Sequence, residues 1–146
     1  TKLYSIDHHM GSEEQQFGEE YFDREIYDFE NNRVNTYPLF IENIKKSDLI
    51  ETVIPIIDNS VAASKKLGDD IDLVFIDGSH TFESARSDYS SWKNKIRKGG
   101  ILAIHDIYDS ELEGGQAPKE IFEKALVENF ELVDRVKSLV ALRKLY

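Results

Sequence analysis

The chain has 146 residues, 40% of them hydrophobic, and a formal net charge of −10 at pH 7. This length is enough for one domain with a core of its own, which we expect to cover residues 1–146. The acidic balance argues against a broad nucleic-acid surface, which needs clustered lysine and arginine. No apolar run is long enough to cross a bilayer, and no signal-peptide pattern opens the chain. The lack of cysteine excludes disulfides and thiolate metal sites, and we expect a cytoplasmic protein.

The first third of the chain contains few periodic segments. A short strand is predicted over Leu3–Ile6, and because a domain rarely begins on the first residue of a core strand, we expect an N-terminally incomplete domain. The acidic segment 8–33, which includes Glu13 and Glu14, is typical of a solvated loop with an irregular helical piece over residues 21–29. A helix is predicted to begin at residues 36–38.

The middle of the chain alternates between strands and helices. Val53–Ile57 is a β-rich run, and its Pro55 favours an edge or near-edge position in a sheet. A helix over residues 61–67 follows, capped by Asn59 or Ser60. The four bulky apolar residues Leu73–Ile76 predict a short strand that is buried on both faces.

The last third continues this alternation. A helix is predicted over residues 82–97, followed by a Gly99-Gly100 break and a second buried strand over Ile101–Ile104. Another helix begins at Pro118, and the tail contains two antiparallel strands, over Phe130–Val136 and residues 138–145. The expected inward-facing positions of the two helices are Phe82, Ala85, Tyr89, Trp92, Ile96, Ile121, Phe122, Ala125 and Leu126. This order predicts an α/β fold with a mostly parallel sheet and one antiparallel strand near its end.

Every predicted parallel strand ends at an acidic residue: Asp7, Asp58, Asp77 and Asp106. In an open parallel sheet, ligands bind beyond the carboxyl ends of the strands, so these residues mark the edge where a site is expected.

Asp77, His105 and Asp106 form a candidate metal site at this edge. Two carboxylates suit Mg²⁺ or Mn²⁺ if His105 stays out, and Mn²⁺, Fe²⁺ or Zn²⁺ if the imidazole joins. The alternative is that the two acids cap the following helices and that His105 packs. Because adjacent residues of a strand point to opposite faces, His105 and Asp106 can both bind a metal only if the chain turns there.

Other polar residues at this edge suggest further roles. His80 is a candidate general base, because histidine as a residue type can exchange a proton near neutral pH, or else a surface histidine that caps a helix. Asp7 suits the binding of ribose hydroxyls, although no glycine-rich loop precedes it. For His8 and His9, simple exposure is the default interpretation.

The stretch Asp72-Leu-Val-Phe-Ile-Asp-Gly-Ser-His80, an aromatic helix and then Lys98-Gly-Gly-Ile-Leu-Ala-Ile-His-Asp106 together resemble the class I S-adenosylmethionine-dependent methyltransferases. The branch in question includes metal-dependent macrolide sugar O-methyltransferases and cephalosporin-hydroxylase-like proteins. The resemblance implies a Rossmann-like sheet with helices on both faces, whose strand order is 3-2-1-4-5-7-6. The first strand and the glycine-rich loop of that fold are not represented in this sequence.

The resemblance also implies residue roles. Asp7 would hold the ribose, His8 would lie beside the adenosine, and Asn59 and Ser60 would line the adenine pocket. Asp77 would lie near the cofactor, and with Asp106 it would bind a divalent metal, usually Mg²⁺. His80 would be the base that deprotonates the substrate hydroxyl. The position before Asp106 is glutamate in the sugar-methylating enzymes and His105 here, which leaves the identity of the metal open.

We therefore predict a divalent-metal-assisted O-methyltransferase that uses S-adenosylmethionine and acts on a small hydroxylated acceptor, such as a sugar or natural product. The expected partners exclude nucleic acid and membranes, and a homo-oligomer stays an open alternative. A catalytically inactive nucleotide-binding domain and a cephalosporin-hydroxylase-like enzyme are the competing hypotheses. A receiver domain is disfavoured, because the chain ends in a predicted hairpin.

Overall fold

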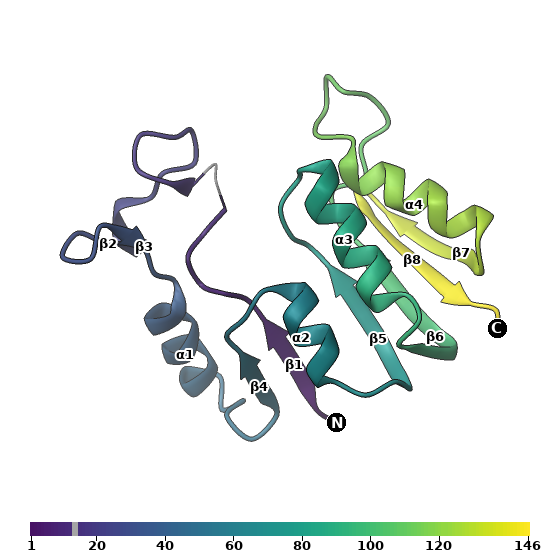
Figure 1. Ribbon diagram of the computed structural model, residues 1–146, viewed down its shortest axis with the longest axis horizontal. Helices are drawn as coiled ribbons and strands as arrows, with labels where there is room; N and C mark the ends of the chain where they lie inside the picture. The colour runs from purple at the N-terminus through teal and green to yellow at the C-terminus, as the bar shows by residue number, and fades with distance from the viewer. Residues whose placement is uncertain (13–14) are drawn as a thin grey trace. The chain divides into compact units, whose positions relative to one another are not determined.

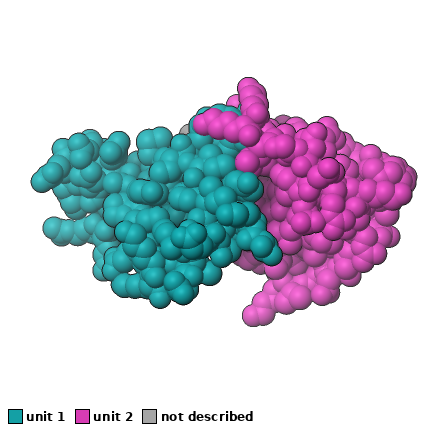
Figure 2. All heavy atoms as spheres, turned by 90° about the horizontal axis from the view of Figure 1, so that it is seen from below, with its two compact units in different colours: residues 1–63 teal, residues 64–146 magenta. Residues whose placement is uncertain are grey.

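The computed structural model of the protein describes residues 1–12 and 15–146, so Glu13 and Glu14 of the acidic segment lie outside the described residues. The chain divides into two compact units, Thr1–Ala63 and Ser64–Tyr146 (Figure 2). The expectation of a single domain over residues 1–146 stays a prediction. Within the described ranges, no helix combines the length and the apolar character that a membrane crossing requires.

The first unit contains a two-stranded parallel sheet. β1 (Leu3–Ile6) pairs with β4 (Val53–Ile56), and Pro55 lies opposite Ser5. Among the described residues, β4 pairs with β1 alone, so the predicted edge position of the proline-containing strand is confirmed. The unit also contains α1 (Tyr37–Lys46) and the start of α2 (Ser60–Lys66). Asn59 caps α2, because its Oδ1 accepts the backbone N–H of Ala62 at 2.9 Å.

A small ribbon lies between β1 and α1. β2 (Tyr27–Asp28) and β3 (Arg33–Val34) pair antiparallel. The helical piece predicted over residues 21–29 is reduced to a single 3₁₀ turn, η2 (Arg24–Ile26). Aromatic rings explain why this polar segment is ordered, since Tyr27 contacts the rings of three phenylalanines, Phe17, Phe22 and Phe29.

The second unit contains a four-stranded mixed sheet in the order β5-β6-β8-β7 (Figure 1). Its strands are β5 (Ile71–Ile76), β6 (Ile96–Ile104), β7 (Phe130–Val136) and β8 (Leu139–Lys144). β5 and β6 are parallel, whereas β8 runs antiparallel to both of its neighbours. The two sheets, β4-β1 and β5-β6-β8-β7, reproduce the 3-2 and 4-5-7-6 parts of the expected strand order. The predicted α/β fold class with an antiparallel C-terminal strand is confirmed.

The core of the second unit lies on one side of this sheet. α3 (Phe82–Trp92) and α4 (Ala117–Val127) lie side by side over this face (Figure 1). Tyr89, Ile121 and Leu142 are fully buried between the helices and the sheet. The prediction that the strand over Leu73–Ile76 is buried on both faces is wrong, because Leu73 and Phe75 are 54% and 52% exposed. Both helices cover the opposite face, where Val74 and Ile76 pack against the core.

The predicted helix over residues 82–97 is too long. α3 ends at Trp92, and Ile96 is the first residue of β6, where it pairs with Ile71. The predicted Gly99-Gly100 break also lies inside β6. A Cβ on Gly100 would meet the Ile96 side chain at 2.7 Å and the Asp72 carbonyl at 3.0 Å, so the close approach of β5 requires glycine there.

Two predicted inward-facing residues lie at the margins of the helices instead. Phe82 is 47% exposed and Leu126 is 41% exposed. The Arg86 guanidinium lies over the Phe82 ring, 5.5 Å from its centroid, so this aromatic side chain packs against a surface cation. The other seven predicted positions are buried or packed against the core.

A polar network ties the end of α3 to the end of α4. The Tyr89 hydroxyl donates to Glu128 Oε2 at 2.7 Å, and Lys93 Nζ donates to the same oxygen at 2.6 Å. The Lys93 hydrogen bond holds the pKa of Glu128 below its usual value against the effect of burial, and the Tyr89 hydroxyl adds to this lowering. Burial and the neighbouring Glu128 carboxylate raise the pKa of Tyr89. The network therefore stays ionised on Glu128 and protonated on Tyr89 at neutral pH.

Candidate active site

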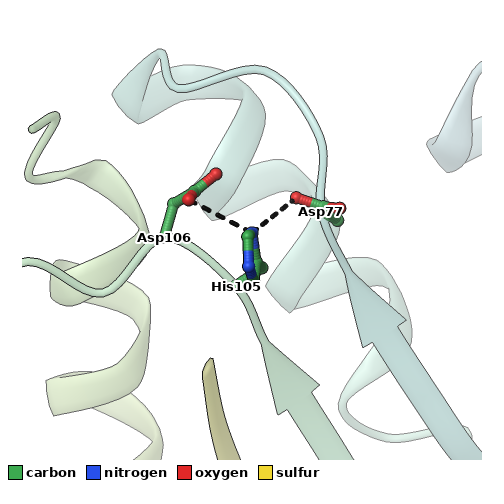
Figure 3. A group of neighbouring side chains, drawn as sticks. All are labelled: Asp77, His105 and Asp106. Carbon is green, nitrogen blue, oxygen red and sulfur yellow. Dashed lines mark ion pairs between the residues drawn. The ribbon is translucent and has the colours of Figure 1, made fainter. Parts of the chain in front are cut away.

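Polar residues from two neighbouring strands meet at one edge of the second unit's sheet. β5 and β6 are parallel, and their last residues, Ile76 and Ile104, are paired in register. Asp77 directly follows β5, and His105 and Asp106 directly follow β6. Their side chains therefore converge, as Figure 3 shows. The structure thus brings together the three residues that we predicted as metal ligands.

The distances in this cluster are short. His105 Nδ1 lies 3.3 Å from Asp77 Oδ1 and 3.1 Å from Asp106 Oδ1. One potential ligand atom from each residue lies within 4.8 Å of the others. Despite these distances, His105 Nδ1 is buried and makes no hydrogen bond. The adjoining cavity has a volume of about 10 Å³, about the space that one water molecule needs.

The backbone turns sharply at Asp106, which has a φ of +58°. An aspartate tolerates this left-handed conformation better than most residues, and such strained positions cluster at functional sites. In a continuing strand, His105 and Asp106 would point to opposite faces. The turn instead folds Asp106 back beside His105, so the condition for both residues to face one cation is met.

The two oxygens of the Asp106 carboxylate have different partners. Oδ2 lies 2.9 Å from His80 Nε2, whereas Oδ1 accepts the Tyr108 hydroxyl at 3.0 Å and lies close to His105 Nδ1. Burial alone would raise the pKa of Asp106, but hydrogen bonds from His80 and Tyr108 and the neighbouring imidazole of His105 lower it overall. Asp106 is therefore ionised at neutral pH and links His80 to the cluster.

Tyr108 was not among the residues predicted from the sequence. It lies two positions after Asp106, in the loop that follows β6, and it could have been found only by considering every polar side chain of that loop. Gly114 leaves the space that the Tyr108 ring occupies, because a Cβ at this position would overlap Tyr108 Cδ2. Gln116 Nε2 donates to the Gly114 carbonyl at 3.1 Å and so fixes this part of the loop.

We expect Gly114→Ala to displace the Tyr108 ring and to break its hydrogen bond to Asp106. Loss of a group that hydrogen-bonds to a metal ligand, as Tyr108 does to the predicted ligand Asp106, typically costs about 10–100-fold in activity or metal affinity. We expect a loss of turnover in that range. Tyr108→Phe, which removes only the hydroxyl, should reproduce the effect. Gly115→Ala is the matched control with a smaller loss, because its Cβ would meet the nearest atom, His80 Cβ, at 3.4 Å. Equal turnover in Gly114→Ala and the wild type would contradict this role of Tyr108.

The predicted cofactor residues of the first unit lie next to β1 and α2. Asp7 directly follows β1, is half-exposed, and accepts the His9 backbone N–H at 2.7 Å. His8 is also partly exposed, and its Nδ1 accepts the Met10 N–H at 3.0 Å. Asn59 caps α2 and Ser60 is its first residue. The cofactor-binding roles of these residues stay predictions.

The expectation that His9 is exposed is wrong. Its side chain is only 5% exposed, and its ring packs against the rings of Tyr37 and Phe40. His9 Nδ1 lies 2.8 Å from the Thr36 hydroxyl oxygen, and the His9 carbonyl accepts the Thr36 N–H at 3.1 Å. His9 therefore anchors the loop after β1 to the start of α1.

The fold and the strand order are those of the class I S-adenosylmethionine-dependent methyltransferases, a class that includes O-methyltransferases of known structure. Residues 1–107 match the family model described as "Methyltransferase domain". The chain belongs to this methyltransferase domain family.

Solved structures support the fold, and a curated protein is similar in sequence. The O-methyltransferase NovP is 18% identical with a TM-score of 0.62, and the match covers 99% of this chain and 60% of that one. The SAH-bound methyltransferase PaMTH1 of Podospora anserina is 14% identical with a TM-score of 0.58, over 81% of this chain and 58% of that one. Uncharacterized protein R132 of Acanthamoeba polyphaga mimivirus is 27% identical over 77 residues, 53% of this chain and 32% of that protein. The chain thus spans about a third of its curated relative and less than two thirds of these structures.

Proposed function

We propose that the protein transfers a methyl group from S-adenosylmethionine to a hydroxyl oxygen of a small molecule, with the help of a divalent cation. One observation carries this proposal: the Asp106 carboxylate contacts His80 through one oxygen and lies within the Asp77–His105–Asp106 cluster through the other. Asp106 therefore connects the proposed proton acceptor, His80, to the proposed cation site. The resemblance to sugar-methylating enzymes favours a sugar or natural product as the acceptor.

His80 is the proposed general base. Ionised Asp106 can only accept a hydrogen bond, so His80 Nε2 carries the proton in their 2.9 Å contact. The neutral imidazole then has its free lone pair on Nδ1, which is the atom that would take the proton of the acceptor hydroxyl. The negative charge of Asp106 stabilises the imidazolium that forms and keeps the ring oriented.

Asp77, His105 and Asp106 would hold the cation. The buried His105 Nδ1 without a hydrogen bond, the adjacent carboxylates and the small cavity fit an ion better than a purely structural cluster. A divalent cation bound there supplies positive charge that favours ionisation of a nearby hydroxyl. The contribution of these side chains is to fix the donor atoms at the end of the sheet.

The first unit would bind the cofactor. The half-exposed Asp7 carboxylate is held by the His9 N–H and can accept ribose hydroxyls, as an acid at this position does in dinucleotide folds. His8 would lie beside the adenosine, and Asn59 and Ser60 would line the adenine pocket. Bound S-adenosylmethionine supplies the electrophilic methyl group.

Calorimetry with S-adenosylmethionine, with and without Mg²⁺ or Mn²⁺, tests this proposal together with turnover on a panel of hydroxylated acceptors. We expect cofactor binding, and turnover that falls when the cation is removed by a chelator. Cofactor binding that ignores cations, with no turnover on any acceptor, would favour an inactive nucleotide-binding domain. Conversion of an acceptor without formation of S-adenosylhomocysteine would favour the cephalosporin-hydroxylase-like alternative.

A further inference from the structure

We infer that His105 Nδ1 is itself a ligand of the cation and that the site therefore selects a divalent transition metal over Mg²⁺. The inference rests on the proposed cation site and specifies which class of ion it binds. The sugar-methylating enzymes that the sequence resembles have glutamate at this position and usually use Mg²⁺, so this chain would differ from them in its metal.

The first argument is the state of the nitrogen. His105 Nδ1 is buried without a hydrogen bond, although it lies 3.1 Å and 3.3 Å from two carboxylate oxygens. Buried polar atoms are nearly always satisfied, and an exception calls for a partner such as an ion. The nitrogen edge of the ring faces both carboxylates, as Figure 3 shows. One donor atom from each of the three side chains therefore lies in a small shared space.

The second argument is the spacing. Two donor atoms about 2.1 Å from one cation and at right angles to each other lie about 3 Å apart. The separations of 3.1 Å and 3.3 Å from His105 Nδ1 to Asp106 Oδ1 and Asp77 Oδ1 are close to this value. The cavity of about 10 Å³ beside them has room for a particle of the size of a water molecule. The distances from His105 Nδ1 to the two carboxylate oxygens therefore match those expected between ligands of one small ion.

The third argument is the fixed position of the ring. The His105 backbone N–H donates to the Ile76 carbonyl at 3.1 Å, which extends the β5–β6 ladder to this residue. Its ring makes an edge contact with Phe75, with 6.4 Å between the centroids. The backbone hydrogen bond to Ile76 and the ring contact with Phe75 together hold the imidazole in place.

The donor set then decides the class of metal. Mg²⁺ strongly prefers oxygen ligands and gains little from an imidazole. Imidazole nitrogen suits Fe²⁺, Co²⁺, Ni²⁺ and Zn²⁺, while carboxylates are accepted by Mn²⁺ and by all of these ions. Two carboxylates and one imidazole therefore form a mixed site for a first-row transition metal.

Pulsed EPR of the Mn²⁺-loaded full-length protein tests the ligand directly, and calorimetry with Mn²⁺ and Mg²⁺ tests the selectivity. We expect nitrogen hyperfine coupling to the bound Mn²⁺, which His105→Glu and His105→Asn abolish. His105→Glu restores an all-oxygen donor set, and we expect it to lower the ratio of the Mn²⁺ affinity to the Mg²⁺ affinity. Val127→Glu is the matched control, because it adds a carboxylate at a position that is 84% exposed at the end of α4. This control should keep both the coupling and the preference.

The possible failures are distinguishable. Bound Mn²⁺ without nitrogen coupling, or an unchanged metal preference in His105→Glu, would overturn the inference and leave the proposed methyltransferase with an all-oxygen site. No Mn²⁺ binding at all would overturn both the inference and the proposed cation. Methyl transfer itself would then be judged separately, from turnover in the presence of a chelator.

Discussion

His80→Ala is expected to lower turnover by about 10²–10⁴-fold, the usual contribution of a positioned general base. The alanine variant removes the imidazole that Asp106 orients through the 2.9 Å contact, so no side chain takes the proton of the acceptor hydroxyl. The dissociation constant of S-adenosylmethionine should stay close to the wild-type value, because its proposed contacts are Asp7, His8, Asn59 and Ser60. Steady-state kinetics at saturating cofactor, with calorimetry for the binding step, measures both quantities.

Two further variants sharpen this test. Asp106→Asn should lower turnover by at least as much, and the double variant should lose little more than the worse single one, because residues that act as a unit are not additive. Arg86→Gln on α3, the helix that begins two residues after His80, is the control, since the ion pair of Arg86 with Glu120 lies at an exposed surface. Wild-type turnover in His80→Ala would rule out His80 as the general base.

The position of the site could be predicted from local patterns. Apolar runs that end in Asp77 and at His105-Asp106 mark strand ends, and parallel neighbours bring their carboxyl ends to one edge. The orientation of the side chains could not be predicted in this way. It depends on the positive φ of Asp106, which no propensity reliably predicts at a single aspartate. Tyr108 was missed for a related reason, because its contact requires the loop after β6 to fold back on itself.

Two of the errors in the second unit's strands and helices have one cause, a contact that is not local in sequence. Ile96 lies four residues after Trp92, which is the spacing of buried positions in a helix. A strand that begins at Ile96 and returns beneath α3 buries the same residue, so the apolar pattern fits both structures. Pairing with Ile71 decides between them, and that contact is not local in sequence. Similarly, an apolar run shows that Leu73 and Phe75 tolerate burial, but the positions of α3 and α4 determine which face is covered.

Leu142→Ala is expected to lower the free energy of unfolding of the second unit by about 2–5 kcal/mol. Leu142 is fully buried in β8, where it pairs with Leu102 of β6 and, on the other side, with Leu132 of β7. Truncation to alanine leaves a cavity beneath α3 and α4 that the rigid sheet fills only in part. Urea unfolding, monitored by the fluorescence of the buried Trp92 of α3, reports on this unit.

Leu132→Ala provides the matched control, because the same chemical change is made at the residue paired with Leu142 on the neighbouring strand. Leu132 is 46% exposed, so its truncation should cost only about 1 kcal/mol. Both variants make the same Leu-to-Ala change at paired positions, and the difference between them therefore reports mainly on the burial of the two side chains. Equal losses would show that the core does not lie on this face. A larger loss for Leu142→Ala would show that β8 is stabilised by burial beneath α3 and α4.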